Sequence, residues 1–325
     1  MAAPFFIATL SAWRAAYADP LPGTMDESTG AAVVKLSIKA IEGARTADSL
    51  GVEREGTGVI IGSRGLILTI GYLVVEAASI LVVTHDGRIY PGVVVGFDHA
   101  TGFGLIRAQG LTDTPAELGD SAAVRELHMV SVVAHAAAGG ESRAAVVARR
   151  RFVGWWEYMI DEAIFTAPPR AQHSGAAMFD ASGRVLGIAS LWVGDVLDIG
   201  AAFPGNMFVP IDLLKPILEE LLATGRRRAA TRPWLGVYTE EREGHVLVSR
   251  VLPESPAQRS GLRRGDVILG VDGESIGGQA EFYEKVWACG DAGVAITLHA
   301  LHNKMVKKVR VETVDRLEYF KPWTY

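Results

Sequence analysis

The sequence is nearly free of cysteine, and it has no excess of basic charge. Cys289 is the only cysteine in 325 residues, which excludes an internal disulfide, a paired-thiol redox centre and a cysteine-rich metal site. The formal net charge is −5, which argues against a broad nucleic-acid surface. Two runs of three arginines, 149–151 and 226–228, are typical of a solvated face or a linker. A hydrophobic content of 49% then indicates a folded chain with a real core.

Long apolar runs are also absent, apart from one near the N-terminus. Residues 2–13 are almost wholly apolar, but a membrane span needs roughly 20 such residues. Ala16-Tyr17-Ala18 follows with the small-x-small form of a signal-peptidase site. We expect residues 1–18 to be an export signal, and we expect a mature chain without a membrane span in the periplasm or another exported location. No basic residue precedes the apolar run, so a buried helix is the alternative.

Short runs with a period of two dominate the rest of the chain. Val34, Leu36 and Ile38 alternate with polar residues, and further β-rich runs lie at 58–61, 80–84, 89–97, 129–134 and 185–192. Many short strands at close spacing predict barrels or sandwiches. Helical spacing appears at 213–223, which ends before Gly225, and again at 279–288. The pattern therefore predicts a mainly β protein of two domains.

The order of several short motifs resembles that of the HtrA-type branch of the trypsin-like serine proteases. In the first domain these motifs are residues 56–61, 65–69, 87–91, 118–121, 174–175, 180–188, 208–211 and 215–216. The second domain is similar to the PDZ domain of the same family, on residues 233–237, 251–253, 255–257, 261–262, 265–269 and 271–273. The resemblance implies a trypsin-like double β-barrel at 30–225, a linker at 226–232, a PDZ domain at 233–314 and an aromatic-rich tail at 315–325.

The residues at the expected catalytic positions depart from this family. The mechanism needs a serine nucleophile, a histidine base and an aspartate that orients the histidine. The motif spacing places Ser174 at the nucleophile position, but Tyr72 stands at the histidine position and Gly102 at the aspartate position. A tyrosine with a pKa around 10 is protonated at pH 7 and is not a base there. Gln172 also replaces the glycine whose N–H belongs to the oxyanion hole of the family.

No other residue supplies an evident base. His173 adjoins Ser174 in the chain, which disfavours useful geometry between the two side chains. His135 lies where the family has a turn near the substrate cleft, so a Ser174–His135 dyad stays open. His85 and His99 fall in or beside turns, and we expect both to be exposed to solvent. Ser174 itself is most simply a remnant in a Ser-Gly turn that the barrel still needs.

The second domain retains the features of a peptide-binding module. A PDZ domain captures a C-terminal carboxylate on backbone N–H groups while the peptide adds a strand to a sheet edge. Trp234-Leu235-Gly236-Val237 matches that loop. We expect these four residues to bind unfolded or C-terminal peptide segments of other proteins, and we expect no cofactor, metal or nucleic acid.

The combined pattern predicts a pseudoprotease that acts as a peptide-binding scaffold in the cell envelope and prefers apolar C-termini or extended segments. The family resemblance implies a homotrimer. Two alternatives remain: a residual or rewired serine endopeptidase for protein quality control that uses Ser174, and a structural scaffold with a silent PDZ domain.

The tail is unusually aromatic for a chain end, with four aromatic residues among the last nine. One hypothesis is that it packs on the surface of its own protein. The other is that Trp323 and Tyr325, which would face the same side of an extended strand, dock into the PDZ groove of a neighbouring subunit.

Overall fold

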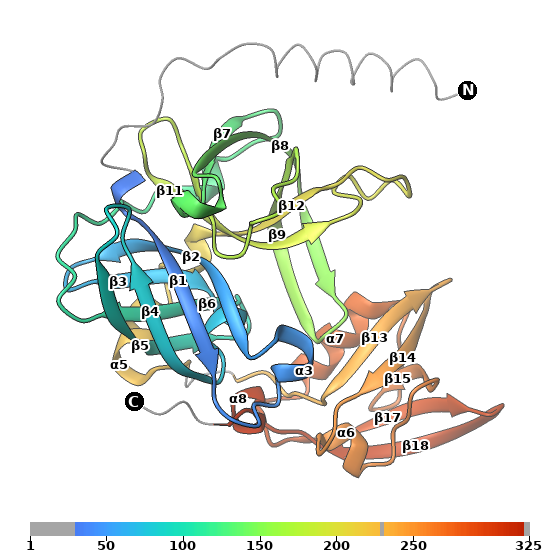
Figure 1. Cartoon of the computed structure of the whole chain (residues 1–325). Helices are drawn as coiled ribbons and strands as arrows, with labels where there is room; N and C mark the ends of the chain where they lie inside the picture. Colours follow the sequence, from blue (N-terminus) through green and yellow to red (C-terminus); the bar gives the residue numbers. More distant parts are fainter. Residues whose placement is uncertain (1–29, 228–230, 322–325) are drawn as a thin grey trace, which may run out of the picture.

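Two closed six-stranded barrels form the N-terminal two thirds of the computed structural model, which describes residues 30–227 and 231–321 (Figure 1). The expected export signal at 1–18, Trp323 and Tyr325 lie outside the described residues. Around the first barrel the strands run β1 (Val33–Ala40), β2 (Glu53–Gly62), β3 (Leu66–Ile70), β6 (Phe103–Ala108), β5 (Ile89–Asp98) and β4 (Ala77–Val83). The second barrel runs β10 (Ala177–Phe179), β11 (Val185–Val193), β12 (Gly205–Pro210), β9 (Tyr158–Ala167), β8 (Glu141–Gly154) and β7 (Met129–Val133).

Alternating side chains close the first barrel around its core. Val34, Leu36 and Ile38 of β1 are at most 3% exposed, because successive side chains of a strand point to opposite faces. β1 pairs with both β2 and β4, so it closes the barrel and leaves no free edge.

Short helical segments connect these strands. They are α3 (Ala47–Leu50), α4 (Gly71–Val74), the 3₁₀ turns η1 (Ser121–Ala123), η2 (Ala136–Ala138) and η3 (Ile211–Leu213), and α5 (Leu218–Thr224). The continuous helix predicted over 213–223 is therefore wrong in its first half. Pro216 has no N–H to donate, and the bonds before it are of the short i→i−3 type, such as Leu214 N–H to the Ile211 carbonyl at 2.9 Å. The α-helix starts only at Leu218.

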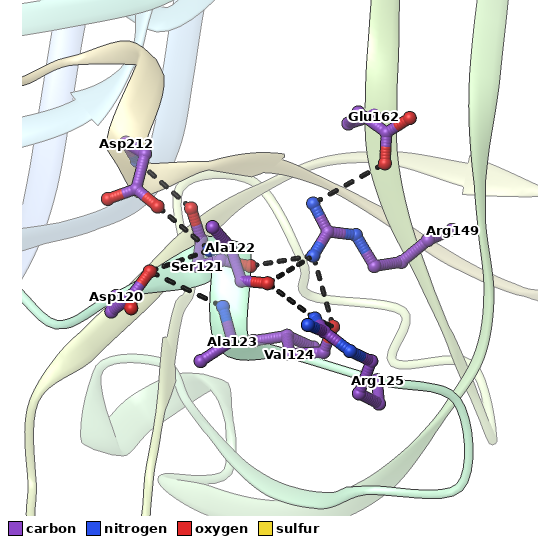
Figure 2. Close-up of polar contacts among 9 residues, drawn as sticks. All are labelled: Asp120, Ser121, Ala122, Ala123, Val124, Arg125, Arg149, Glu162 and Asp212. Atoms are coloured by element: carbon purple, nitrogen blue, oxygen red, sulfur yellow. Dashed lines mark hydrogen bonds and ion pairs between the residues drawn. The ribbon is translucent and has the colours of Figure 1, made fainter.

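The arginine run at 149–151 is not a fully solvated face. Figure 2 shows Arg149 reaching from β8 to η1, where its guanidinium donates to the carbonyls of Ser121 at 2.8 Å and Val124 at 3.0 Å. Its side chain is only 16% exposed. The Asp120 carboxylate caps the other end of η1 by accepting the Ala122 N–H at 2.9 Å. Arg149 thus satisfies the carbonyl groups of a turn, a tertiary contact that the charge run alone did not reveal.

The C-terminal domain is a single sheet in the order β13 (Val237–Arg242), β14 (His245–Val251), β15 (Val267–Val271), β17 (Ala295–His302) and β18 (Met305–Glu312), with β16 (Glu274–Ser275) beside β15. The predicted helix at 279–288 is confirmed as α7 (Gln279–Ala288), which buries Phe282, Tyr283 and Val286 against this sheet. Ser255 caps the short helix α6 (Pro256–Arg259) by accepting the Gln258 N–H at 3.2 Å.

The chain returns to the first barrel after this domain. Helix α8 (Arg316–Tyr319) places the Tyr319 ring 4.7 Å from that of Trp234. Beyond it, the Lys321 N–H donates at 2.9 Å to the carboxylate of Glu76, which is fully buried and also accepts from Thr46 Oγ1 at 2.6 Å. The part of the tail that is described thus packs on its own protein. Among the described residues, no helix is long and apolar enough to cross a bilayer.

Candidate functional site: a tyrosine–serine pair and an occupied carboxylate loop

Tyr72 and Ser174 meet between the two barrels. Tyr72 lies in α4, directly after β3, and its Oη is 2.9 Å from Ser174 Oγ. The same Oη is 2.9 Å from the carbonyl oxygen of Ser190 on β11. A carbonyl only accepts, so the single phenolic proton goes to Ser190 when that bond forms, and the Ser174 hydroxyl then donates to the phenol oxygen. The structure therefore brings together the residues at the expected nucleophile and base positions.

The phenol has no basic character at neutral pH. Burial raises the pKa of Tyr72 to about 12, although the bond to Ser174 partly opposes this rise. A hydroxyl that points at a neutral phenol gains little nucleophilicity, because activation requires a group that takes the proton. This pair joins two chain segments, and a neutral phenol is not a group that takes the proton of Ser174.

The turn that carries Ser174 is fixed by packing. The Ser174 carbonyl accepts the Thr57 N–H at 2.9 Å. Gly175 follows with φ +76°, and a Cβ at this position would lie 2.0 Å from the Thr57 carbonyl oxygen. Only glycine fits such a close approach in the left-handed region. The contact with the first barrel therefore accounts for a glycine directly after Ser174.

Gly102 lies where no carboxylate could be added without a local shift. Its φ is +83°, and a Cβ built on it would be 3.0 Å from the Oη of Tyr158. The Tyr158 hydroxyl is buried and donates to the Thr101 carbonyl at 2.7 Å. The nearby Asp98 carboxylate is already used by Thr101, through its N–H at 2.9 Å and its Oγ1 at 2.7 Å.

Within the described ranges, no histidine ring nitrogen forms a hydrogen bond with Ser174 Oγ. The His173 Nδ1 is bonded to the Ala171 carbonyl at 2.9 Å, and burial lowers the pKa of this ring. His135 is 6% exposed, its Nε2 lies 3.7 Å from the exposed Glu55, and its Nδ1 has no partner among the described residues. Gln172 is exposed, and its carbonyl accepts from the Arg170 guanidinium at 3.3 Å.

The two histidines expected at the surface differ. His85 is exposed, as predicted. His99 is half-buried, and burial together with the charge of Arg316 lowers its pKa to about 4. The expectation for His99 is therefore wrong, because α8 returns from the far end of the chain and brings Arg316 near it.

The loop before β13 holds a carboxylate from the same chain. The N–H groups of Gly236 and Val237 donate to Glu157 Oε1 at 2.7 and 2.9 Å, and that of Leu235 donates to Oε2 at 2.9 Å. Three of the four residues predicted to bind peptide thus present N–H groups to one carboxylate. Trp234 instead donates its N–H to the Val314 carbonyl at 3.1 Å.

A cavity of about 1380 Å³ lies between the Tyr72–Ser174 pair and the loop before β13. Residues from both sides line it: Tyr72, Gly102, His173 and Ser190 from the barrels, and Trp234 and Tyr238 from the C-terminal domain. In the part of the chain that the structure describes, no group of three or more His, Cys, Asp or Glu side chains could hold a metal ion.

Glu157 and Tyr158 are candidate functional residues that the sequence did not reveal. They sit side by side at the end of the β8–β9 turn, one bonded to the carboxylate loop and the other filling the space at Gly102. No motif marks either residue. The only local signal is a glutamate in a turn beside two tryptophans.

Two family models match the chain. The trypsin-like peptidase domain matches residues 56–188, and the PDZ domain matches residues 233–313. The putative serine protease HhoA of Synechocystis sp. is 30% identical over 303 residues, which cover 80% of this chain and 71% of HhoA. The chain belongs to the HtrA family.

Other members of the family match this chain at similar sequence identity. The serine endoprotease DegS of Haemophilus influenzae is 29% identical over 68% of this chain and 66% of its own length. A probable periplasmic serine endoprotease, DegP-like, of Pseudomonas putida is 29% identical, and this chain spans 48% of its length. The expected HtrA-type resemblance is confirmed.

Solved HtrA structures share the fold. The HtrA-type protease AlgW with a decapeptide is 21% identical with a TM-score of 0.54, over 91% of this chain and 97% of that chain. The serine endoprotease from Yersinia pestis is 22% identical with a TM-score of 0.54, over 91% of this chain and 99% of its own. The predicted mainly β architecture, a trypsin-like double barrel followed by a PDZ domain, is confirmed.

Proposed function

We propose that this HtrA-family chain is a pseudoprotease that acts as a peptide-binding scaffold in the cell envelope. The observation that carries the proposal is the 2.9 Å contact between Ser174 Oγ and a tyrosine phenol in the position of the catalytic base. Losing the histidine or the serine of a triad lowers kcat about 10⁶-fold. Gly102 offers no carboxylate to replace the missing aspartate.

The PDZ domain supplies the binding activity in this proposal. Its loop, Trp234 to Val237, would take the terminal carboxylate of an apolar C-terminus or of an unfolded segment. Two features support this assignment: Leu235, Gly236 and Val237 already hold a carboxylate, and the related AlgW has been solved with a decapeptide. The domain boundaries at 225, 233 and 314 and a homotrimeric assembly belong to the same proposal.

The compartment is also proposed from the relatives. Several of them are named as probable periplasmic endoproteases, and residues 1–18 have the pattern of an export signal. A fusion of residues 1–29 to alkaline phosphatase, an enzyme that is active only after export, tests this. An inactive fusion in intact cells would contradict it.

Digestion of fluorescent casein separates the proposed scaffold from an endopeptidase. The full chain and its Ser174→Ala variant should release fluorescence at the same background rate, because Ser174 has no base. Faster release by the wild-type chain than by Ser174→Ala would favour the rewired endopeptidase. Binding of no C-terminal peptide by any form of the full chain would favour a structural scaffold with a silent PDZ domain.

A further inference from the structure

The long β8–β9 hairpin of the second barrel ends inside the PDZ domain. In Figure 1 its two strands extend away from the barrel and turn beside α7 and β13. The turn consists of residues 155–157, between Gly154 at the end of β8 and Tyr158 at the start of β9. The tip of the hairpin therefore lies beside the strand and the helix that border a PDZ peptide groove.

The turn presents its carboxylate to the loop that binds a peptide terminus in such domains. Glu157 is 5% exposed, and its two oxygens accept three backbone N–H bonds of 2.7 to 2.9 Å from residues 235–237. A buried carboxylate is stable only when donors satisfy it. A cluster of backbone N–H groups is also how proteins capture a C-terminal carboxylate.

The backbone of the turn also bonds to the strand that a bound peptide would extend. β13 is the edge strand of its sheet, and its Thr239 N–H donates to the Trp155 carbonyl at 2.8 Å. On the opposite side of the groove, the Tyr283 hydroxyl of α7 donates to the Gly154 carbonyl at 2.9 Å. The segment thus contacts the sheet edge, the helix and the carboxylate loop together, and these are the elements that border a PDZ peptide groove.

The backbone conformation of Glu157 also indicates that contacts with the PDZ loop, and not the turn itself, favour a glutamate here. Its φ is +56°, and the last position of a three-residue hairpin turn with positive φ usually carries glycine or asparagine. A glutamate at this position is strained, so the turn's own geometry does not account for it. Its three bonds to the PDZ loop do.

We infer that the β8–β9 turn is a built-in ligand of the PDZ domain, in which the Glu157 side chain stands in for a peptide's terminal carboxylate. An external C-terminal peptide then binds only by displacing the turn. This inference rests on the proposed peptide-binding function of the same groove. It adds that the β8–β9 turn occupies the groove in the chain without a bound peptide.

The test uses three forms of the full chain: wild type, Glu157→Gln and the control Glu162→Gln. Glu162 lies on the same hairpin, but its side chain is 70% exposed and pairs with Arg149, so this control changes the charge equally without touching the groove. The probe is a pool of fluorescent decapeptides with three degenerate C-terminal positions and a free carboxylate. An amidated copy of the pool shows whether the terminal carboxylate is needed. Fluorescence anisotropy measures binding, and amide hydrogen exchange follows residues 235–239.

We expect Glu157→Gln to bind the carboxylate pool about ten- to hundredfold more tightly than the wild type or Glu162→Gln, with no gain for the amidated pool. Amides 235–237 should exchange faster in Glu157→Gln alone. Glu157→Gly removes the carboxylate and accepts the positive φ without strain, so it must give the same result if Glu157→Gln folds poorly.

Equal affinity of wild type and Glu157→Gln for the pool would overturn the inference while leaving peptide binding intact. Unchanged exchange at residues 235–237 in both Glu157 variants would overturn it as well. If these amides are released but no form binds the pool, the proposed peptide-binding function fails, and the turn is then only an interdomain contact.

Discussion

Wild-type Ser174 should react with a fluorophosphonate probe no faster than an ordinary serine. The pKa of its partner Tyr72 is raised to about 12 by burial, so only about one molecule in 10⁵ carries a phenolate at pH 7. A serine without its base loses about 10⁶ in rate, or roughly 8 kcal/mol of transition-state stabilisation. Tyr72→His places an imidazole in α4 next to the serine and should restore part of this loss.

The structure sets how much each further substitution recovers. Without a carboxylate partner, Tyr72→His should label about 10⁴-fold more slowly than an intact triad. Adding Gly102→Asp should recover little, because a Cβ at residue 102 meets the Tyr158 Oη at 3.0 Å and the backbone there has φ +83°. Tyr158→Phe removes that oxygen, so the triple variant should label faster than the double. It should still label more slowly than trypsin, because Gln172 stands at the family's oxyanion-hole glycine.

In-gel fluorescence at pH 7 measures these rates, with trypsin as the reference and Ser174→Ala as the blank in each background. Thermal unfolding confirms that each variant is folded. Labelling of the wild type at the rate of trypsin, lost in Ser174→Ala, would refute the pseudoprotease proposal. Loss of this labelling in His135→Ala as well would identify His135 as the base. Equal rates for the double and triple variants would show that Tyr158 does not obstruct residue 102.

Two further results are expected. Glu76→Ala should lower the free energy of unfolding by about 3–5 kcal/mol in urea titrations, because the buried donors of Thr46 and the N–H of Lys321 lose their acceptor. A loss below 1 kcal/mol would show that the bonds to Glu76 do not stabilise the fold. Gly175→Ala should cost about 2–4 kcal/mol in the same assay, and an unchanged midpoint would show that the turn tolerates a side chain.

The strands were predictable from alternation along the chain, whereas the double barrel and the positions of Tyr72, Gly102 and Ser174 were predicted from the resemblance to the HtrA family. Alternation at Val34, Leu36 and Ile38 specifies one buried face of a strand wherever that strand lies. The position of Tyr72 follows from counting three residues past Thr69. This spacing predicts position well because β3 and the helical turn that follows it directly are neighbours in the chain and in the structure.

Contacts between segments that lie far apart in the sequence were not predictable in this way. Glu157 meets Leu235 across 78 residues of chain, and only the length and direction of the hairpin bring them together. Arg149 looked like a solvated charge because its hydrogen-bond acceptors at η1 are backbone carbonyls, which carry no sequence signal. His99 looked exposed because Arg316 approaches it from the opposite end of the chain.

The return of the chain to the first barrel after α8 gives the PDZ domain two attachments instead of one. The linker holds one end, and the bond from Lys321 to Glu76 holds the other, so the domain has no freedom to diffuse around a single tether. The effective concentration of the β8–β9 turn at the groove therefore stays high, and a weak intrinsic affinity suffices to keep it closed. The anchoring carboxylate of Glu76 is also linked to the serine site by direct bonds. Glu76 bonds Thr46, Thr46 bonds Arg54, and Arg54 bonds the carbonyl of the tyrosine that faces Ser174. The C-terminal attachment of the PDZ domain and the Tyr72–Ser174 pair therefore belong to one continuous network of hydrogen bonds.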